Sequence, residues 1–128
     1  MNDRIRILVG YDGSLQSKKA LKEAITIATH FSGFIKVVNV CEREKKEEAE
    51  ATILEAKQNL EKEKVAYESL LVFGSNPAKA LVIMAKKENF DLIAVGSRGL
   101  GRKVSMLLGS VSKQVVSNAY CNVLVIKK

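Results

Sequence analysis

Short apolar runs alternate along the chain with longer stretches in which hydrophobic residues recur every three or four positions. A short run rich in β-branched residues predicts a strand that is covered on both faces, and a period of three to four predicts an amphipathic helix. Five segments have the strand pattern: Ile5–Tyr11, Phe34–Cys41, Val65–Phe73, Asp91–Gly96 and Asn122–Lys128.

Four helices are predicted in the segments between these strands. Ser14 offers an N-cap to the first helix, and Gly33 stops it. The third helix begins at Asn76, a capping residue, and Pro77, which fits the first helical position, and it runs to Glu88. The second helix lies in the charged stretch from Glu42, and its apolar stripe is Ala49, Ile53, Ala56 and Leu60. The fourth is marked by the apolar stripe Leu107, Val111, Val115 and Ala119.

The regular alternation of strand and helix predicts a parallel sheet with helices on both faces and right-handed crossovers. In such sheets, ligands bind beyond the carboxyl ends of the strands, where the strand order reverses. If the first and fourth strands are central neighbours, "GYDGS" from Gly10 and "GSRGLG" from Gly96 face each other across that crevice.

Composition places the chain among soluble globular proteins. It has 128 residues, 47% hydrophobic and 27% charged, which favours a single domain over residues 1–128. No apolar run approaches the roughly 20 residues of a membrane span, and the N-terminus is too short and too charged for a signal peptide. We therefore expect a cytoplasmic protein. Cys41 and Cys121 lack metal-ligand spacing and are predicted to be buried free thiols.

The net charge of +7 is unevenly spread, because the chain from Ser97 to its end has six Lys or Arg and no Asp or Glu. This basic region is either a solvated surface or the binding region for a phosphate-bearing ligand. A third possibility is nucleic acid, which the lack of any RNA- or DNA-binding motif in the sequence disfavours.

A glycine-rich stretch lies inside this basic region, with Gly96, Gly99 and Gly109 in the spacing G-2x-G-9x-G, followed by Ser110. Gly96 ends a predicted strand, so a ligand can lie close to its backbone. Gly109 and Ser110 open a predicted helix, whose first N–H groups bind phosphate well. The alternative is a long connection that only reaches the last helix. A dinucleotide fingerprint and the Lys-Ser/Thr of a P-loop are both absent.

At this point the sequence resembles the universal stress protein family. The resemblance is carried by "ILVGYDGS" from Ile7, "AVGSRGLG" from Ala94, "LLGSVSKQVV" from Leu107 and "CNVLVI" from Cys121. It implies an open, Rossmann-like sheet of five parallel strands in the order 3-2-1-4-5, and members commonly dimerise. The subgroup that has the G-2x-G-9x-G-(S/T) element binds ATP. Asn122 departs from the proline that is usual before the last strand.

The resemblance also implies roles for individual residues. Around the nucleoside it places Gly10, Asp12, the main chain of Val40, Val95 and Gly96. Around the phosphates it places Arg98, Gly99, Gly109, Ser110 and Val111, although Arg98 stands where the family varies. The Asp12 carboxylate would accept a hydrogen bond from the nucleotide or lie near its Mg²⁺ ion, which proteins hold with few carboxylates plus phosphates.

Two function classes follow for the chain. The first is a stress-response regulator or switch that binds ATP, ADP or AMP. The second is a homodimeric interaction module with a vestigial nucleotide pocket. In both, residues 122–127 form an apolar edge strand that invites pairing with a second copy. The sequence has one histidine, His30, far from the glycine-rich stretch, and no catalytic set around it. We therefore expect slow ATP hydrolysis at most, not a dedicated enzyme.

Overall fold

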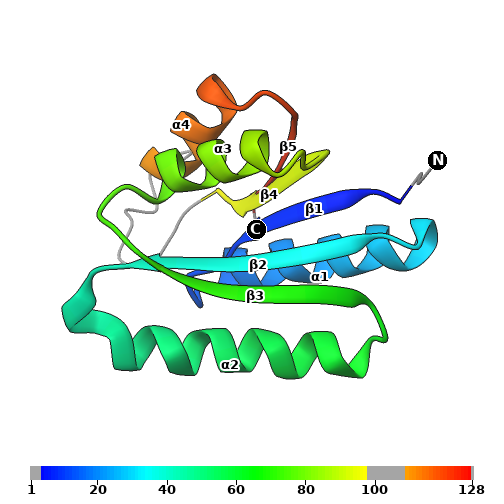
Figure 1. Cartoon of the computed structure of the whole chain (residues 1–128), viewed down its shortest axis with the longest axis horizontal. Helices are drawn as coiled ribbons and strands as arrows, with labels where there is room; N and C mark the ends of the chain where they lie inside the picture. The colour runs from blue at the N-terminus through cyan, green and yellow to red at the C-terminus, as the bar shows by residue number, and fades with distance from the viewer. Residues whose placement is uncertain (1–3, 98–108, 128) are drawn as a thin grey trace.

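A computed structural model describes residues 4–97 and 109–127 and contains one sheet of five parallel strands (Figure 1). The order of the strands is β3-β2-β1-β4-β5, as the sequence and its family resemblance predicted. The strands are β1 (Arg6–Gly10), β2 (Phe34–Cys41), β3 (Ala66–Phe73), β4 (Leu92–Gly96) and β5 (Asn122–Ile126). The helices are α1 (Leu15–Phe31), α2 (Lys46–Lys62), α3 (Pro77–Lys87) and α4 (Ser110–Asn118), with a 3₁₀ turn, η1 (Arg43–Lys45), before α2.

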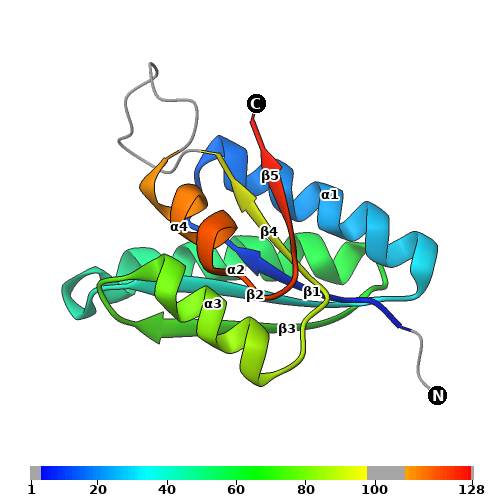
Figure 2. The same cartoon turned by 90° about the horizontal axis from the view of Figure 1, so that it is seen from above.

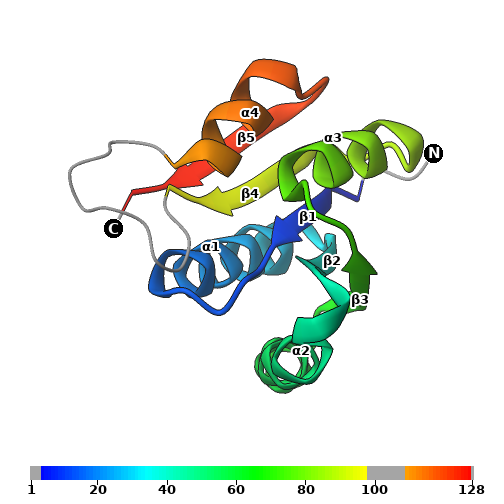
Figure 3. The same ribbon diagram turned by 90° about the vertical axis from the view of Figure 1, so that its left-hand side faces the viewer.

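The helices form a layer on each side of the sheet, with α1 and α2 on one face and α3 and α4 on the other (Figure 3). Residues along β1 alternate between the two layers. Ile7 and Val9 pack toward α1, and Leu8 packs toward α3, all three with no exposed surface. A strand buried on both faces must be apolar throughout, which explains why the strand signal in the sequence was so clear.

The strand order reverses beside β1, which lies at the centre of the sheet (Figure 2). From β1 the chain builds outward through β2 to β3, and then returns to β4 on the opposite side of β1. The carboxyl ends of β1 and β4 therefore flank the crevice in which open α/β sheets bind ligands.

Two helix starts follow their capping residues as predicted. The Ser14 hydroxyl accepts from the N–H of Ser17 at 3.2 Å, and the Asn76 side chain accepts from the N–H of Lys79 at 3.1 Å. Gly33 follows α1 for a steric reason, because a Cβ there would come within 2.8 Å of the Ile5 carbonyl oxygen. Close approach of two backbones thus fixes this glycine.

Two details differ from the sequence-based expectation. The α2 helix begins at Lys46 after η1, not directly at Glu42. The two cysteines are free thiols but only half-buried, and both lie at the limits of strands, Cys41 as the last residue of β2 and Cys121 directly before β5. No helix among the described residues combines the length and the apolar run that crossing a membrane requires.

One charged side chain enters the protein interior. Lys36 on β2 is only 7% exposed and lies between two glutamates. Its Nζ is 2.9 Å from the Glu88 carboxylate, at the end of α3, and 3.2 Å from that of Glu68, directly opposite on β3. Burial acts to lower the pKa of Lys36, but the hydrogen bonds to Glu88 and Glu68 together raise it above its usual value. The two carboxylates thus keep this buried ammonium charged.

Candidate functional site

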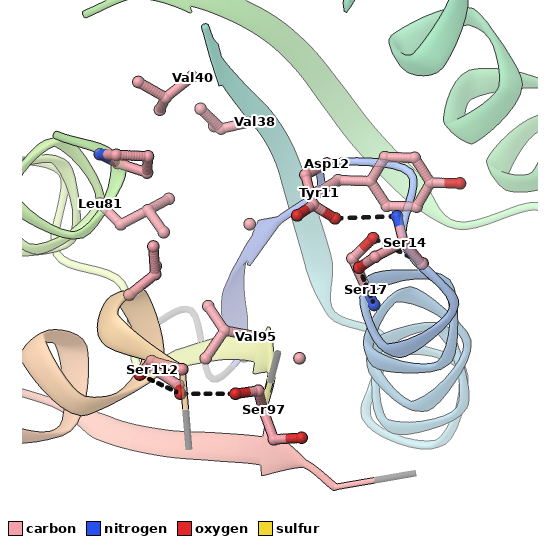
Figure 4. Close-up of a pocket in the computed structure, with 15 residues that line it drawn as sticks. Tyr11, Asp12, Ser14, Ser17, Val38, Val40, Leu81, Val95, Ser97 and Ser112 are labelled. Atoms are coloured by element: carbon pink, nitrogen blue, oxygen red, sulfur yellow. Dashed lines mark hydrogen bonds between the residues drawn. The ribbon is translucent and has the colours of Figure 1, made fainter. Parts of the chain in front are cut away.

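A cavity of about 270 Å³ opens at the carboxyl ends of β1 and β4, where the topology favours a ligand site (Figure 4). Seven of the ten residues predicted for the site line this cavity: Gly10, Asp12, Val40, Val95, Gly96, Gly109 and Val111. Ser110 opens α4 but is not among the residues that line it. Arg98 and Gly99 lie outside the described residues.

The cavity has an apolar side and a polar side (Figure 4). Val38, Val40 and Leu81 form the apolar side, which Pro77 and Val95 extend. The polar side consists of carboxylate and hydroxyl groups from the β1–α1 loop, the first turn of α1, the residue after β4 and the first turn of α4. These residues are Asp12, Ser14, Ser17, Ser97 and Ser112. Such a lining suits a ligand that has a flat apolar part and several hydrogen-bonding groups.

The main chain of Val40 adds a donor and an acceptor on the apolar side. In a parallel sheet, successive residues direct their main-chain groups alternately to the two neighbouring strands. Val38 faces β1, since its carbonyl accepts from the N–H of Tyr11 at 2.9 Å. Val40 has the same orientation, but β1 pairs with β2 only as far as Gly10, opposite Val38. The N–H and C=O of Val40 are therefore directed toward the cavity.

The loop between β1 and α1 is held in place from two directions. One Asp12 carboxylate oxygen accepts from the N–H of Ser14 at 2.9 Å, which orients the side chain at the cavity wall. The Tyr11 hydroxyl donates to the Glu55 carboxylate on α2 at 2.8 Å. Burial, and then this bond to Glu55, raise the pKa of Tyr11, so its phenol stays neutral. No local pattern in the sequence indicates this pair, whose residues are 44 positions apart.

Ser97 joins β4, β5 and α4 at the cavity wall and is 1% exposed. Its N–H donates to the Ile126 carbonyl at 2.7 Å, and its hydroxyl donates to the Lys127 carbonyl at 3.1 Å. Its own carbonyl accepts from the Gly109 N–H and from the Ser112 hydroxyl, the latter at 3.1 Å. The Gly109 amide thus has a protein acceptor already. The amides of Val111 and Ser112, in the first turn of α4, also precede its first internal bond, from the Lys113 N–H to the Gly109 carbonyl, and point toward the helix start.

Gly96 lines the cavity, but the structure shows another reason for its lack of a side chain. A Cβ at this position would lie 2.5 Å from the Gln16 Cβ and 3.0 Å from the Ser17 amide nitrogen, both in the first turn of α1. Helix packing, rather than a ligand, fills the space beside its Cα. No pattern in the sequence identifies this contact with α1.

Gly96→Ala is therefore expected to destabilise the fold by about 1–3 kcal/mol, the usual range for adding a methyl group where the packing leaves no room. Urea unfolding followed by circular dichroism measures this difference. Gly74→Ala is the matched control, because a Cβ there meets only the Val40 Cγ1 at an ordinary 3.7 Å. Equal losses in the two variants would contradict the steric explanation.

Comparison with known proteins agrees with this architecture. The Universal stress protein family model matches residues 4–127. A universal stress protein of Thermus aquaticus is 36% identical, over 94% of this chain and 97% of that protein. A universal stress protein of Methanocaldococcus jannaschii is 31% identical, over 96% of this chain and 82% of that protein.

A solved structure of a universal stress protein in complex with cAMP has a TM-score of 0.78. It is 28% identical to this chain, and the alignment covers 95% of each chain. The match of the family model, the relatives aligned over most of their length and the shared sheet topology lead to one conclusion: this chain belongs to the universal stress protein family.

Proposed function

We propose that this protein binds an adenine nucleotide in the cavity beyond β1 and β4 and acts as a nucleotide-dependent regulator of a stress response. The observation that carries the proposal is the cavity itself, which has an apolar side next to the main-chain donor and acceptor of Val40 and a helix start on its far side. The cAMP complex of a family member supports an adenine nucleotide as the ligand.

In this proposal, the base lies against Val38, Val40 and Leu81, where a flat ring removes the most apolar surface from water. The Val40 N–H and C=O pair with the hydrogen-bonding edge of adenine. The ribose lies beside Asp12, between Gly10 and the segment Val95–Gly96. The family resemblance also placed Gly10, Asp12, the main chain of Val40, Val95 and Gly96 at the nucleoside.

The phosphates would lie at the start of α4, where amide groups and the helix dipole favour anions. Because the Gly109 N–H donates to Ser97, we assign the amide contacts to Val111 and Ser112 rather than to Gly109. The resemblance adds Arg98, Gly99 and Ser110 to this end of the site. The basic charge of the chain from Ser97 onward has the sign that a triphosphate requires.

ATP is our first choice of ligand because the G-2x-G-9x-G-S element is complete in this sequence. The described residues contain no group of three His, Cys, Asp or Glu side chains that could hold a metal ion. Mg²⁺ would therefore arrive with the nucleotide, its phosphates supplying most ligands and Asp12 one. We expect hydrolysis at this site to be slow at most.

The nucleotide content of purified protein tests the proposal directly. Heat denaturation followed by chromatography of the supernatant should release an adenine nucleotide. Titration calorimetry of nucleotide-free protein with ATP, ADP, AMP and cAMP, each with and without Mg²⁺, should then rank ATP first. Protein that carries no nucleotide and gives no heat with any of the four would overturn the proposal.

We also propose that β5 pairs with its counterpart in a second copy to form a homodimer. The strand lies at the edge of the sheet, and Val123 and Val125 are half-buried. Because the Ile126 carbonyl accepts a hydrogen bond from Ser97 on the β4 side, alternation directs the main-chain groups of Val125 outward. An outward-facing, apolar edge strand is the usual site of pairing between chains.

Val125→Pro is expected to convert a dimer to a monomer, because proline removes an outward N–H without breaking a bond to β4. Sedimentation equilibrium measures the mass in solution, which is 14.1 kDa for one chain and twice that for a dimer. Val125→Thr keeps the N–H and the branched shape, and it should remain dimeric. A wild type that sediments as a monomer at tens of micromolar, roughly where a modest interface assembles, would refute the dimer.

A further inference from the structure

A second cavity, also of about 270 Å³, lies beside the first at the carboxyl end of β2. It occupies the corner where the chain turns from β2 into α2, at the left of Figure 1. Asp12, Val40 and Pro77 line both cavities, so the two adjoin along this shared wall. The nucleotide assignment leaves the second cavity without a role.

Asn39 lines the second cavity and is only 6% exposed. It lies on the side of β2 that packs toward α2, next to Val37. Within residues 4–97 and 109–127, its carboxamide makes no hydrogen bond to any side chain or main-chain group. A buried amide without a partner costs about 1–3 kcal/mol, so native proteins rarely leave one in place without a reason. A bound molecule that forms a hydrogen bond with the Asn39 side chain would supply the missing partner.

The charges around the second cavity favour a cation. Its lining includes the carboxylates of Asp12, Glu42 and Glu48 and the single ammonium of Lys45. Arg43 is not among the residues that line the cavity, and its guanidinium lies 4.6 Å from the centre of the Phe73 ring.

The lining also includes Cys41, but its thiol adds no charge. Burial, and then the charge of Glu44, raise the pKa of Cys41, so the thiol stays neutral. A positively charged group would therefore be attracted to the cavity mouth and would meet the carboxamide oxygen of Asn39 inside.

We propose that this cavity is a second ligand subsite that takes a primary amino group, donated to the Asn39 oxygen and to the surrounding carboxylates. The amine can belong to a small free molecule or to a substituent on the base of a nucleotide in the first cavity. The second source rests on the proposed nucleotide function, since Val40 lines both cavities at the base end. The first source does not depend on it.

The side-chain amide signals of Asn39 in a nitrogen–proton correlation spectrum of labelled full-length protein test the subsite. The signals are assigned by their loss in Asn39→Leu. Four probes are compared: AMP, AMP with a 6-aminohexyl group on its exocyclic amine, the hexyl analogue without the terminal amine, and free hexane-1,6-diamine. The aminohexyl nucleotide and the free diamine should both shift the Asn39 signals, and the hexyl analogue should not.

Affinity gives a second, independent measure. The aminohexyl nucleotide should bind the wild type about tenfold more tightly than the hexyl analogue does. This affinity ratio should disappear in Asn39→Leu and fall in Glu48→Gln. Because Glu48 is exposed, the second variant is expected to fold and tests the subsite even if Asn39→Leu misfolds.

The outcomes separate the two proposals. If no nucleotide binds but the diamine shifts Asn39, the nucleotide function is wrong and the subsite stands. Suppose that nucleotides bind but neither the aminohexyl nucleotide nor the free diamine shifts the Asn39 signals, and the aminohexyl nucleotide binds no more tightly than the hexyl analogue. The cavity then holds only water and the subsite is refuted. Equal shifts from the hexyl and aminohexyl groups would also refute it, because the amine would then have no part in binding.

Discussion

Gly109→Val is expected to lower the affinity for adenine nucleotides about 100-fold, or about 2.7 kcal/mol. Gly109 is buried, lines the cavity and is the N-cap residue of α4. Its backbone has φ −75° and ψ 170°, an extended conformation that valine adopts without strain. The loss would therefore arise from the branched side chain at the place where the phosphates approach, and not from a distorted backbone.

Titration calorimetry with ATP on the wild type and the variant measures this loss. Ser117→Val is the matched control, because it adds a similar side chain to the exposed surface of the same helix. Thermal unfolding of all three proteins shows whether the fold survives. A folded Gly109→Val variant with the affinity of the wild type would show that the phosphates do not lie at the start of α4.

Removing both carboxylates that surround Lys36 is expected to destabilise the protein by about 3 kcal/mol, because the ammonium is then buried without a partner. The double variant Glu68→Gln, Glu88→Gln retains the shapes of the side chains and removes only their charges. Adding Lys36→Met should restore most of the lost stability, since an apolar side chain of similar length suits the buried position. The buried charge, rather than the carboxylates, would then be the source of the effect.

Urea unfolding at neutral pH measures the free energy of unfolding of the wild type, the double variant and the triple variant. A pH series tests whether the charge of Lys36 is the cause of the difference. The pKa of Lys36 is raised above its usual 10.5. A raised pKa in the folded state contributes stability below the unfolded value, and this is lost as the pH rises through the folded value. The stability gap between the wild type and Lys36→Met should therefore change only in strongly alkaline solution. A triple variant no more stable than the double variant would contradict this account.

The sequence was sufficient for the sheet and for seven of the residues that line the cavity. Strands buried on both faces produce unbroken apolar runs, and Ser14 and Asn76 have clear capping signals. The topological rule then brought Gly10 and Gly96 together from opposite halves of the chain, with the α4 start beside them. These inferences needed only local patterns and the position of the strand ends.

The contacts that were missed join residues far apart in sequence, and their pairing depends on register and crossing angles. Lys36 and Glu88 are 52 residues apart, and nothing in either local pattern selects the other. A lysine inside an apolar strand is itself a signal of a buried ion pair, although it does not name the partner. Asn39, in the same strand, is the corresponding signal for the second cavity.

Ser97 has a consequence for how the molecule opens. Its N–H and hydroxyl hold the end of β5, and its carbonyl holds Gly109 and Ser112 at the start of α4. The sheet edge and the cavity wall therefore share one set of hydrogen bonds, and we expect them to open together as one cooperative unit. Fraying of β5 in solution would expose the cavity to solvent exchange, and a molecule seated in the cavity would slow amide exchange at the edge of the sheet.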